Sequence, residues 1–184
     1  MINDISDKLS VYLKKRYPNE LPSVSIVRYS IKFLISNITP ILVLIVSSML
    51  LRIFPEVMIA LLGFSILRMF SGGYHIKSAE VCIVVSVVLV YTIVMVSPLI
   101  QNIKTIIDIA SLVLVVIFAP SNIKKQTRIK EENFIYLKIV SLMIIAGNFI
   151  VHSNILTLAF FLQSLSLIRI VYSEKEVMRN AKDE

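Results

Sequence analysis

The stretch IKFLISNITPILVLIVSSMLLRI, residues 31–53, decides the fold of this chain. It exceeds the about 20 mostly apolar residues that a helix needs to cross a bilayer. Its only charged residues, Lys32 and Arg52, lie close to its two ends. Pro40 lies inside the stretch, and we expect a kink there, with the freed carbonyl satisfied by neighbouring helices. The stretch therefore predicts a transmembrane helix.

Five further apolar runs follow this one along the chain. They cover residues 56–69, 79–97, 103–119, 134–151 and 154–171. The run 56–69 is shorter than the about 17 residues at the lower limit of a span, so whether it crosses stays open. The short connection 151–154 predicts an antiparallel hairpin of the last two runs. Together the runs predict an all-α fold, a polytopic transmembrane helical bundle of about six membrane helices.

The composition supports a membrane domain. Hydrophobic residues make up 57% of the chain, charged residues 17%, and the mean hydropathy is +0.83. A soluble domain is about 45–50% apolar and about 25% charged. We expect one integral membrane domain over 1–184, with an N-terminal helix and linker (1–30), a transmembrane bundle (31–171) and a cytoplasmic tail (172–184).

Residues 2–17 carry a helical pattern of a different kind. Apolar residues recur at steps of three and four, with charged residues mostly between them; they are Ile2, Ile5, Leu9, Tyr12 and Leu13. This spacing predicts an amphipathic helix, which Pro18 and Pro22 end. Such a helix lies either on a protein surface or in the membrane interface, and the neighbouring spans favour the interface.

Positive charges favour one side of the predicted membrane. The formal net charge is +7, and nearly all Lys and Arg residues fall in alternate segments. With the N-terminus inside, the outer segments hold only Arg52 and Lys104. Because short loops rich in Lys and Arg stay cytoplasmic, six spans with both termini in the cytoplasm fit well, and four spans remain an alternative. Since topology explains the basic residues, the lipid bilayer is the expected partner and nucleic acid is not.

The segment RMFSGGYHIKSAEVC, residues 68–82, carries the residues suited to chemistry. Cys82 is the only cysteine, so it is an inert thiol, part of an intermolecular bridge, or a reactive thiolate. Its place near the start of a predicted helix favours the thiolate, and a nearby imidazole would act as base. His75 lies seven residues earlier, close to two helical turns, so contact between the two side chains is feasible.

Other residues of the segment allow two interpretations each. Gly72 and Gly73 form either a simple turn or a loop that leaves N–H groups free for an oxyanion. Glu80 is either a first-turn helix acid, which we favour, or a group that orients His75. Arg68 and Lys77 are either topology residues at the membrane surface or substrate contacts.

The string Arg68 to His75 with its adjacent glycines, followed by Cys82, resembles the signature of the accessory gene regulator B (AgrB) family. The resemblance extends to the chain length, the basic amphipathic start, the apolar runs and the Ala119-Pro120 step before a Lys-rich loop. It implies a bacterial cell-membrane endopeptidase of quorum sensing, with its active site near the cytoplasmic face.

The resemblance also implies a mechanism. Such enzymes remove the acidic C-terminal part of an AgrD-like propeptide through an acyl-enzyme thioester, and the product closes into a thiolactone or lactone. Cys82 would be the nucleophile and His75 the general base, with Arg68 and Gly73 at positions that matter for activity. A homodimer is implied, and no cofactor or metal is expected.

Basic residues near the inner surface are candidates for docking the acidic tail of the propeptide. Besides Lys77 they are Lys124, Lys125, Arg128 and Lys130 in the loop 121–133. The alternative is that this loop only determines topology.

Two other functions compete with the peptidase. A small transporter would use polar residues within the spans, namely Asn37, Thr39, Gln163, Ser164 and Ser166. Asp108 is the only acid well inside an apolar run, and Lys104, one turn away, is placed to pair with it. A non-catalytic membrane assembly partner is the other alternative.

Overall fold

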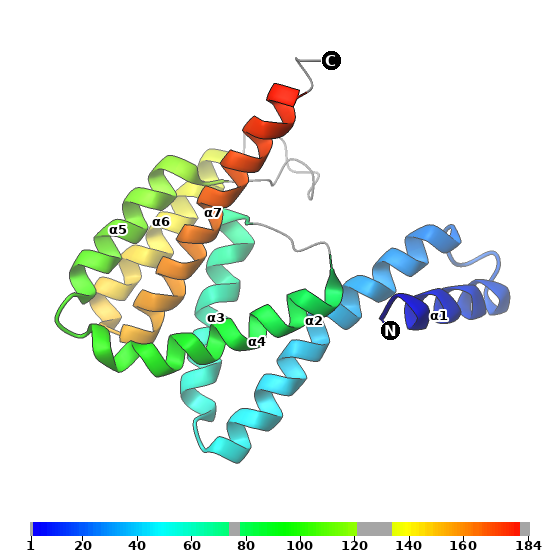
Figure 1. The fold of residues 1–184 in the computed structure, drawn as a ribbon, viewed down its shortest axis with the longest axis horizontal. Coiled ribbons are helices and arrows are strands. Elements are labelled where there is room, and N and C mark those ends of the chain that lie inside the picture. The colour runs from blue at the N-terminus through cyan, green and yellow to red at the C-terminus, as the bar shows by residue number, and fades with distance from the viewer. Residues whose placement is uncertain (1, 74–77, 121–133, 181–184) are drawn as a thin grey trace. The chain divides into compact units, whose positions relative to one another are not determined.

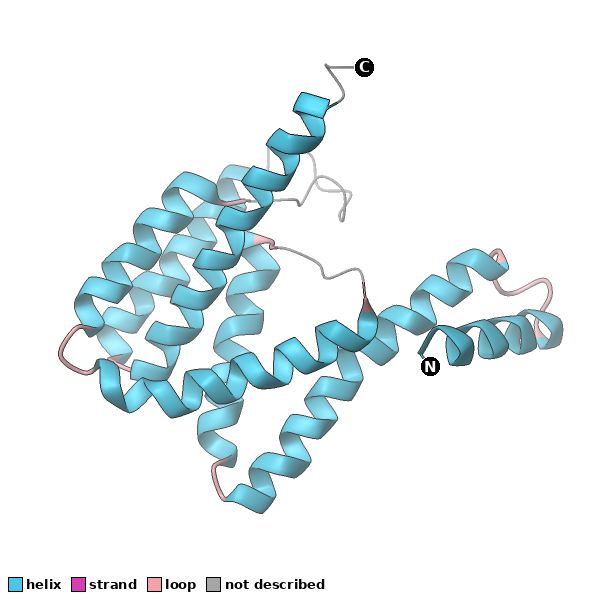
Figure 2. Cartoon of the chain, in the orientation of Figure 1, coloured by secondary structure: helices cyan, strands magenta, loops and turns pink. Residues whose placement is uncertain are grey.

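The computed structural model describes residues 2–73, 78–120 and 134–180, and the regular elements of this part of the chain are all helical (Figure 2). In chain order they are α1 (Ile2–Arg16), α2 (Val24–Leu51), α3 (Phe54–Ser71), α4 (Ala79–Val96), the 3₁₀ turn η1 (Ser97–Ile100), α5 (Lys104–Phe118), α6 (Phe134–Val151) and α7 (Asn154–Asn180). The all-α prediction is therefore confirmed.

Each predicted apolar run coincides with a helix. Within the described residues, four helical segments are long and apolar enough to cross a membrane: Val24–Leu51, Phe54–Ser71, Glu80–Ile100 and Phe134–Val151. The second of these is longer at both ends than the predicted run 56–69, because Phe54 and Ser71 are also helical. The helix α2 continues through Pro40, and the expected kink there stays a prediction. The count of six spans also stays a prediction.

The chain separates into two compact units, which are described here one at a time. The first comprises 1–54 and 75–89, and the second comprises 55–74 and 90–184. The helix α4 contributes residues to both.

In the first unit, α1 lies along α2 (Figure 1). Its buried residues are Ile2, Ser6 and Ser10, and the short serine side chains allow close approach. Asp7 of α1 pairs with Arg28 of α2, with 2.6 Å between Oδ1 and Nε. The amphipathic helix is confirmed, although Ile5, Leu9 and Tyr12 of its apolar stripe stay exposed beside the contact with α2. Its place in the membrane interface stays a prediction.

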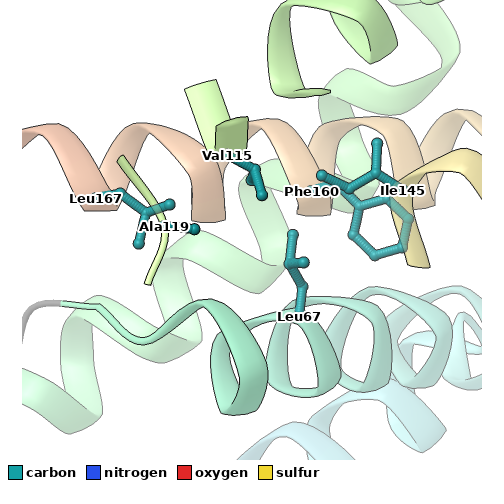
Figure 3. Packing of buried hydrophobic residues seen from close by; sticks show 6 residues of the cluster. All are labelled: Leu67, Val115, Ala119, Ile145, Phe160 and Leu167. Atoms are coloured by element: carbon teal, nitrogen blue, oxygen red, sulfur yellow. The ribbon is translucent and has the colours of Figure 1, made fainter. Parts of the chain in front are cut away.

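In the second unit, α5, α6 and α7 run side by side (Figure 1). The short turn between Val151 and Asn154 makes α6 and α7 neighbours, and His152 in this turn has a left-handed φ of 56°. A cluster of buried hydrophobic side chains comes from four elements and the segment after α5 (Figure 3): Leu67, Val115, Ala119, Ile145, Phe160 and Leu167. Leu67 therefore fixes α3 against the other helices.

Gly63 allows α3 to approach α7 closely. A Cβ atom at this position would lie 2.6 Å from Cδ2 of Leu156, closer than side-chain carbons pack. The same Cβ would lie 3.7 Å from side-chain atoms of Ala159 and Phe160. Because Gly63, Leu67 and Ser71 recur at steps of four and are buried, they form one face of α3, and the close approach at Gly63 brings that face to α7.

A buried polar cluster joins the ends of α5, α6 and α7. Asp108 is 0% exposed, and its Oδ2 lies 3.3 Å from Nζ of Lys104, which confirms the pairing expected from the sequence. The Nδ2 of Asn148 donates to Oδ1 of Asp108 at 3.2 Å and to Oγ1 of Thr157 at 2.8 Å. The side-chain oxygen of Asn148 accepts from the N–H of Ser153 in the turn at 3.1 Å. We call this set the Asp108 cluster. Its bonds explain how an apolar bundle holds a carboxylate.

Candidate functional site

Cys82 lies in the first turn of α4, as the sequence predicted. Its N–H donates to the carbonyl of Ser78 at 3.0 Å, which is the first bond of the helix. The thiol is free and partly exposed. The first N–H groups of any helix lack partners within it and carry the positive end of the helix dipole. The start of α4 therefore places Cys82 beside the positive end of the helix dipole.

Glu80 is exposed two residues before Cys82 and contacts α1. Its Oε1 accepts a hydrogen bond from the N–H of Ile2 at 3.4 Å. A carboxylate at the first N–H groups of a helix satisfies donors that have no partner within that helix. Glu80 therefore supports the attachment of α1 to the start of α4 within the first unit. Whether Glu80 has a role in the reaction stays a prediction.

Gly72 and Gly73 follow directly after α3 in the second unit, and both are buried. Their φ angles are 79° and 153°, which residues with a Cβ atom rarely adopt. The N–H of Gly72 still donates to the carbonyl of Arg68 at 3.0 Å, as in a helix, but the positive φ of Gly72 ends the helix at this point. The two glycines end the helix in a buried place, where a Cβ atom on Gly73 would be crowded.

Gln163 of α7 holds this glycine turn. Its Nε2 donates to the carbonyl of Gly72 at 2.7 Å and to Oγ of Ser71 at 3.1 Å. Because a carbonyl oxygen only accepts, the amide must present its NH₂ group to Gly72. The hydroxyl of Ser71 in turn donates a hydrogen bond to the carbonyl of Leu67 at 2.8 Å. Both Gln163 and Ser71 are 0% exposed. We call Ser71, Gly72 and Gln163 the Gln163 cluster.

Arg68 lies near the same turn. Its Nη1 would lie 3.5 Å from a Cβ placed on Gly73, and the guanidinium carbon lies 6.0 Å from the ring centroid of Phe64. A Cβ on Gly73 would also lie 3.3 Å from Nε2 of Gln163 and 3.4 Å from Oγ of Ser166. The second unit thus brings Arg68, Gly72 and Gly73 together.

Several predicted site residues lie outside the described residues. They are His75, Lys77, Lys124, Lys125, Arg128 and Lys130. The contact between His75 and Cys82 and the docking of an acidic tail therefore stay predictions. Among the residues that are described, no three His, Cys, Asp or Glu side chains gather as metal ligands would.

Four of the polar residues considered for a transport path, Asn37, Gln163, Ser164 and Ser166, are hydrogen-bonded within the protein. Asn37 donates to the carbonyl of Phe33 at 2.7 Å, and Ser164 donates to the carbonyl of Phe160 at 2.7 Å. Ser166 donates to the carbonyl of Gln163 at 2.7 Å. Each of these three side chains bonds to a carbonyl of its own helix, and Asp108 is paired with Lys104, which favours a structural role for them.

Sequence reasoning missed Ser71 as a site residue and assigned Gln163 only to a transport path. Ser71 lies two residues after the run 56–69, Gln163 lies in the middle of the run 154–171, and nothing in their spacing links the two positions. The available signal was a glutamine inside an apolar helix, which needs a hydrogen-bonding partner when buried.

Long apolar helices and a lone thiol at a helix start define the chain as a helical membrane protein with a candidate nucleophile. The family model described as "Accessory gene regulator B" matches residues 4–173. The chain therefore belongs to the accessory gene regulator B family.

Curated relatives agree with this assignment. Accessory gene regulator protein B of Staphylococcus aureus strain JH9 is 26% identical over 185 aligned residues, covering 92% of this chain and 96% of the relative. The protein of the same name from the bovine strain RF122 / ET3-1 is 25% identical over the same coverage. No solved structure matches the chain.

Proposed function

We propose that this chain is a membrane-embedded cysteine endopeptidase that processes an AgrD-like propeptide in accessory gene regulator quorum sensing. One observation supports it most. Cys82, the only cysteine of this chain, lies partly exposed in the first turn of α4, seven residues after His75 in the sequence. A cysteine deep inside an apolar span would be inert, whereas this one lies beside the positive end of a helix dipole.

In the proposed reaction, His75 takes the proton of the Cys82 thiol, and the sulfur attacks the carbonyl of the scissile bond. The C–N bond breaks, His75 returns the proton to the leaving amine, and the acidic C-terminal part departs. The N-terminal part stays on Cys82 as a thioester. A thiol or hydroxyl within the propeptide then attacks this thioester, which closes the ring and releases the Cys82 thiol.

Ring closure competes with hydrolysis of the thioester, so water must be kept from the site. A site at the inner rim of the bilayer favours the internal nucleophile for this reason. The Lys-rich loop 121–133 would attract the acidic tail of the propeptide, over a range of about 8 Å at physiological salt. Both termini would lie in the cytoplasm, as the distribution of Lys and Arg indicates.

The test is co-expression of the full chain with a propeptide that has an amphipathic start, a central Cys or Ser and an acidic tail. Cys82→Ala and Cys82→Ser should abolish cleavage, while membrane insertion and protein level stay those of the wild type. Cleavage at the wild-type rate by correctly inserted Cys82→Ala would refute the proposal.

A further inference from the structure

The half of α4 that carries Cys82 is sparsely packed. None of the side chains of residues 80–89 is buried, and the first buried one after them is Val90. Each of the other α-helices buries at least one side chain within its first eight residues. A segment with few buried contacts is held in place weakly by packing. The position of the first turns of α4 therefore depends on other contacts.

One such contact is a hydrogen bond to the start of α1. The N–H of Ile2 donates to Oε1 of Glu80 at 3.4 Å, across 78 residues of sequence. Because Ile2 is the first residue of α1, its N–H has no acceptor within that helix. Glu80 is the second residue of α4. The bond thus joins the starts of two helices of the first unit.

The helix α1 is itself fixed on α2. Its face with Ser6 and Ser10 is buried, with exposed fractions of 1% and 0%. Asp7 on the same helix pairs with Arg28 of α2. The first residue, Ile2, is also buried. The helix α1 is therefore a firm support, and Glu80 ties the start of α4 to it.

We propose that Glu80 is a positioning residue of the peptidase, which ties the first turn of α4 to α1 and thereby fixes the place of Cys82. Cys82 lies two residues after Glu80 in the same turn. Since residues two apart in a helix do not face each other, Glu80 acts through the backbone of this turn. The inference rests on the proposed function, because it takes Cys82 as the nucleophile.

The first experiment measures how fast an uncharged maleimide alkylates Cys82, the only cysteine, in the full chain purified in detergent. Glu80→Leu removes the acceptor, so the first turn of α4 opens more often. We expect the alkylation rate to rise about two- to tenfold, the factor by which one lost hydrogen bond shifts an equilibrium. Glu80→Gln keeps an acceptor oxygen and should retain nearly the rate of the wild type.

Two comparisons separate the hydrogen bond from the charge of Glu80. Glu20→Leu removes the same charge from an exposed position between α1 and α2, and should leave the alkylation rate unchanged. A direct effect of the Glu80 charge on the thiol would instead make Glu80→Gln as fast as Glu80→Leu.

A second pair of variants tests whether α1 carries the effect. Ser6 is 1% exposed, so Ser6→Leu should push α1 away from α2, whereas Val11→Leu changes a position that is 54% exposed. We expect Ser6→Leu to raise the alkylation rate as Glu80→Leu does, and Val11→Leu to leave it unchanged. The double variant Ser6→Leu/Glu80→Leu should be no faster than the faster single variant, because both changes break one link.

The third measurement is cleavage of the propeptide that the wild type processes. Glu80→Leu should lower kcat about two- to tenfold with little change in KM, since a misplaced nucleophile slows chemistry more than binding. Glu80→Gln should restore most of this loss. A role of Glu80 in folding alone would reduce the amount of folded protein and leave the kcat of the folded fraction unchanged.

The inference is wrong if folded Glu80→Leu keeps either the alkylation rate or the kcat of the wild type, or if Glu80→Gln changes both as much. Should Glu80→Leu not fold, Ser6→Leu and Val11→Leu decide, and equal alkylation rates of the two refute the inference. If Cys82→Ala still cleaves, the proposed function fails. An inactive Cys82→Ala with a normal Glu80→Leu refutes only the role of Glu80.

Discussion

The Asp108 cluster and the Gln163 cluster are both buried, polar and include residues of α7, yet their hydrogen bonds join different parts of the protein. The first joins side chains of α5, α6 and α7 to one another and to the turn before α7. The second joins a side chain of α7 to the backbone of a glycine turn after α3. A polar side chain that bonds to side chains of other helices stabilises the packing of those helices. One that bonds to the backbone of a turn fixes the conformation of that turn. The two clusters should therefore respond differently to substitution.

The largest effect on stability should follow from Lys104→Met. It removes the cation that lies 3.3 Å from the carboxylate of Asp108, which is 0% exposed. A buried charge left without its partner costs about 3–5 kcal/mol. Unfolding in mixed detergent micelles measures this loss. The double variant Lys104→Met/Asp108→Leu should recover much of it, and a double variant as unstable as the single one would contradict the assignment of an ion pair.

Gly73→Ala should lower the rate of propeptide cleavage strongly and the melting temperature only slightly. Lys104→Met should instead lower the stability. Its Cβ would lie 3.3 Å from Gln163 and 3.4 Å from Ser166, with φ at 153°. Strain of this kind costs about 1–3 kcal/mol, and the turn would shift to relieve it. Cleavage of the propeptide and the melting temperature should be measured on the same preparation. Full activity of this variant would show that the turn has no influence on the reaction.

Gly63→Ala and Gly147→Ala form a matched pair that tests the approach of α3 to α7. The added methyl at Gly63 meets Leu156 at 2.6 Å, whereas at Gly147 nothing lies within 4 Å. We expect Gly63→Ala to cost about 1–3 kcal/mol through overpacking. Gly147→Ala should be neutral or stabilising by up to about 1 kcal/mol, since alanine favours helix. Equal melting temperatures of the two variants would contradict the close packing.

The smallest effect on stability should come from breaking the exposed ion pair between Asp7 and Arg28. It serves as a comparison for the buried ion pair between Lys104 and Asp108. Its side chains are 47% and 50% exposed, so solvent screens the attraction. Such pairs contribute about 0–1 kcal/mol. Asp7→Asn should therefore change the stability far less than Lys104→Met does. A comparable loss would mean that α1 depends on this pair more than its exposure suggests.

The sequence predicted the helices well because their hydrophobic signal is local. The runs that became α2 to α7 are long and apolar, and the pairing of Lys104 with Asp108 follows from a spacing of one helical turn. The position of Cys82 in the first turn of α4 was predicted for the same reason. Local patterns of this kind require no knowledge of tertiary packing.

The Gln163 cluster could not be predicted, because it depends on which helix faces which. Gly63 and Leu67 bring α3 against α7, and only then does residue 163 meet the turn at residue 72. The apolar stripe of α1 was predicted correctly, but the face that α1 buries on α2 is the one with Ser6 and Ser10. A pattern of hydrophobic residues identifies the surface that prefers an apolar environment and does not identify the neighbour.

The most direct test of the central claim is intact-mass spectrometry of the full chain after reaction with a propeptide whose ring-closing Cys or Ser is replaced by alanine. Without that nucleophile the acyl group should remain on the enzyme. We predict an added mass equal to the N-terminal fragment less one water, located on Cys82 and removed by hydroxylamine as a thioester is. Cleavage without any adduct on Cys82, and at the same rate in Cys82→Ala, would contradict the account.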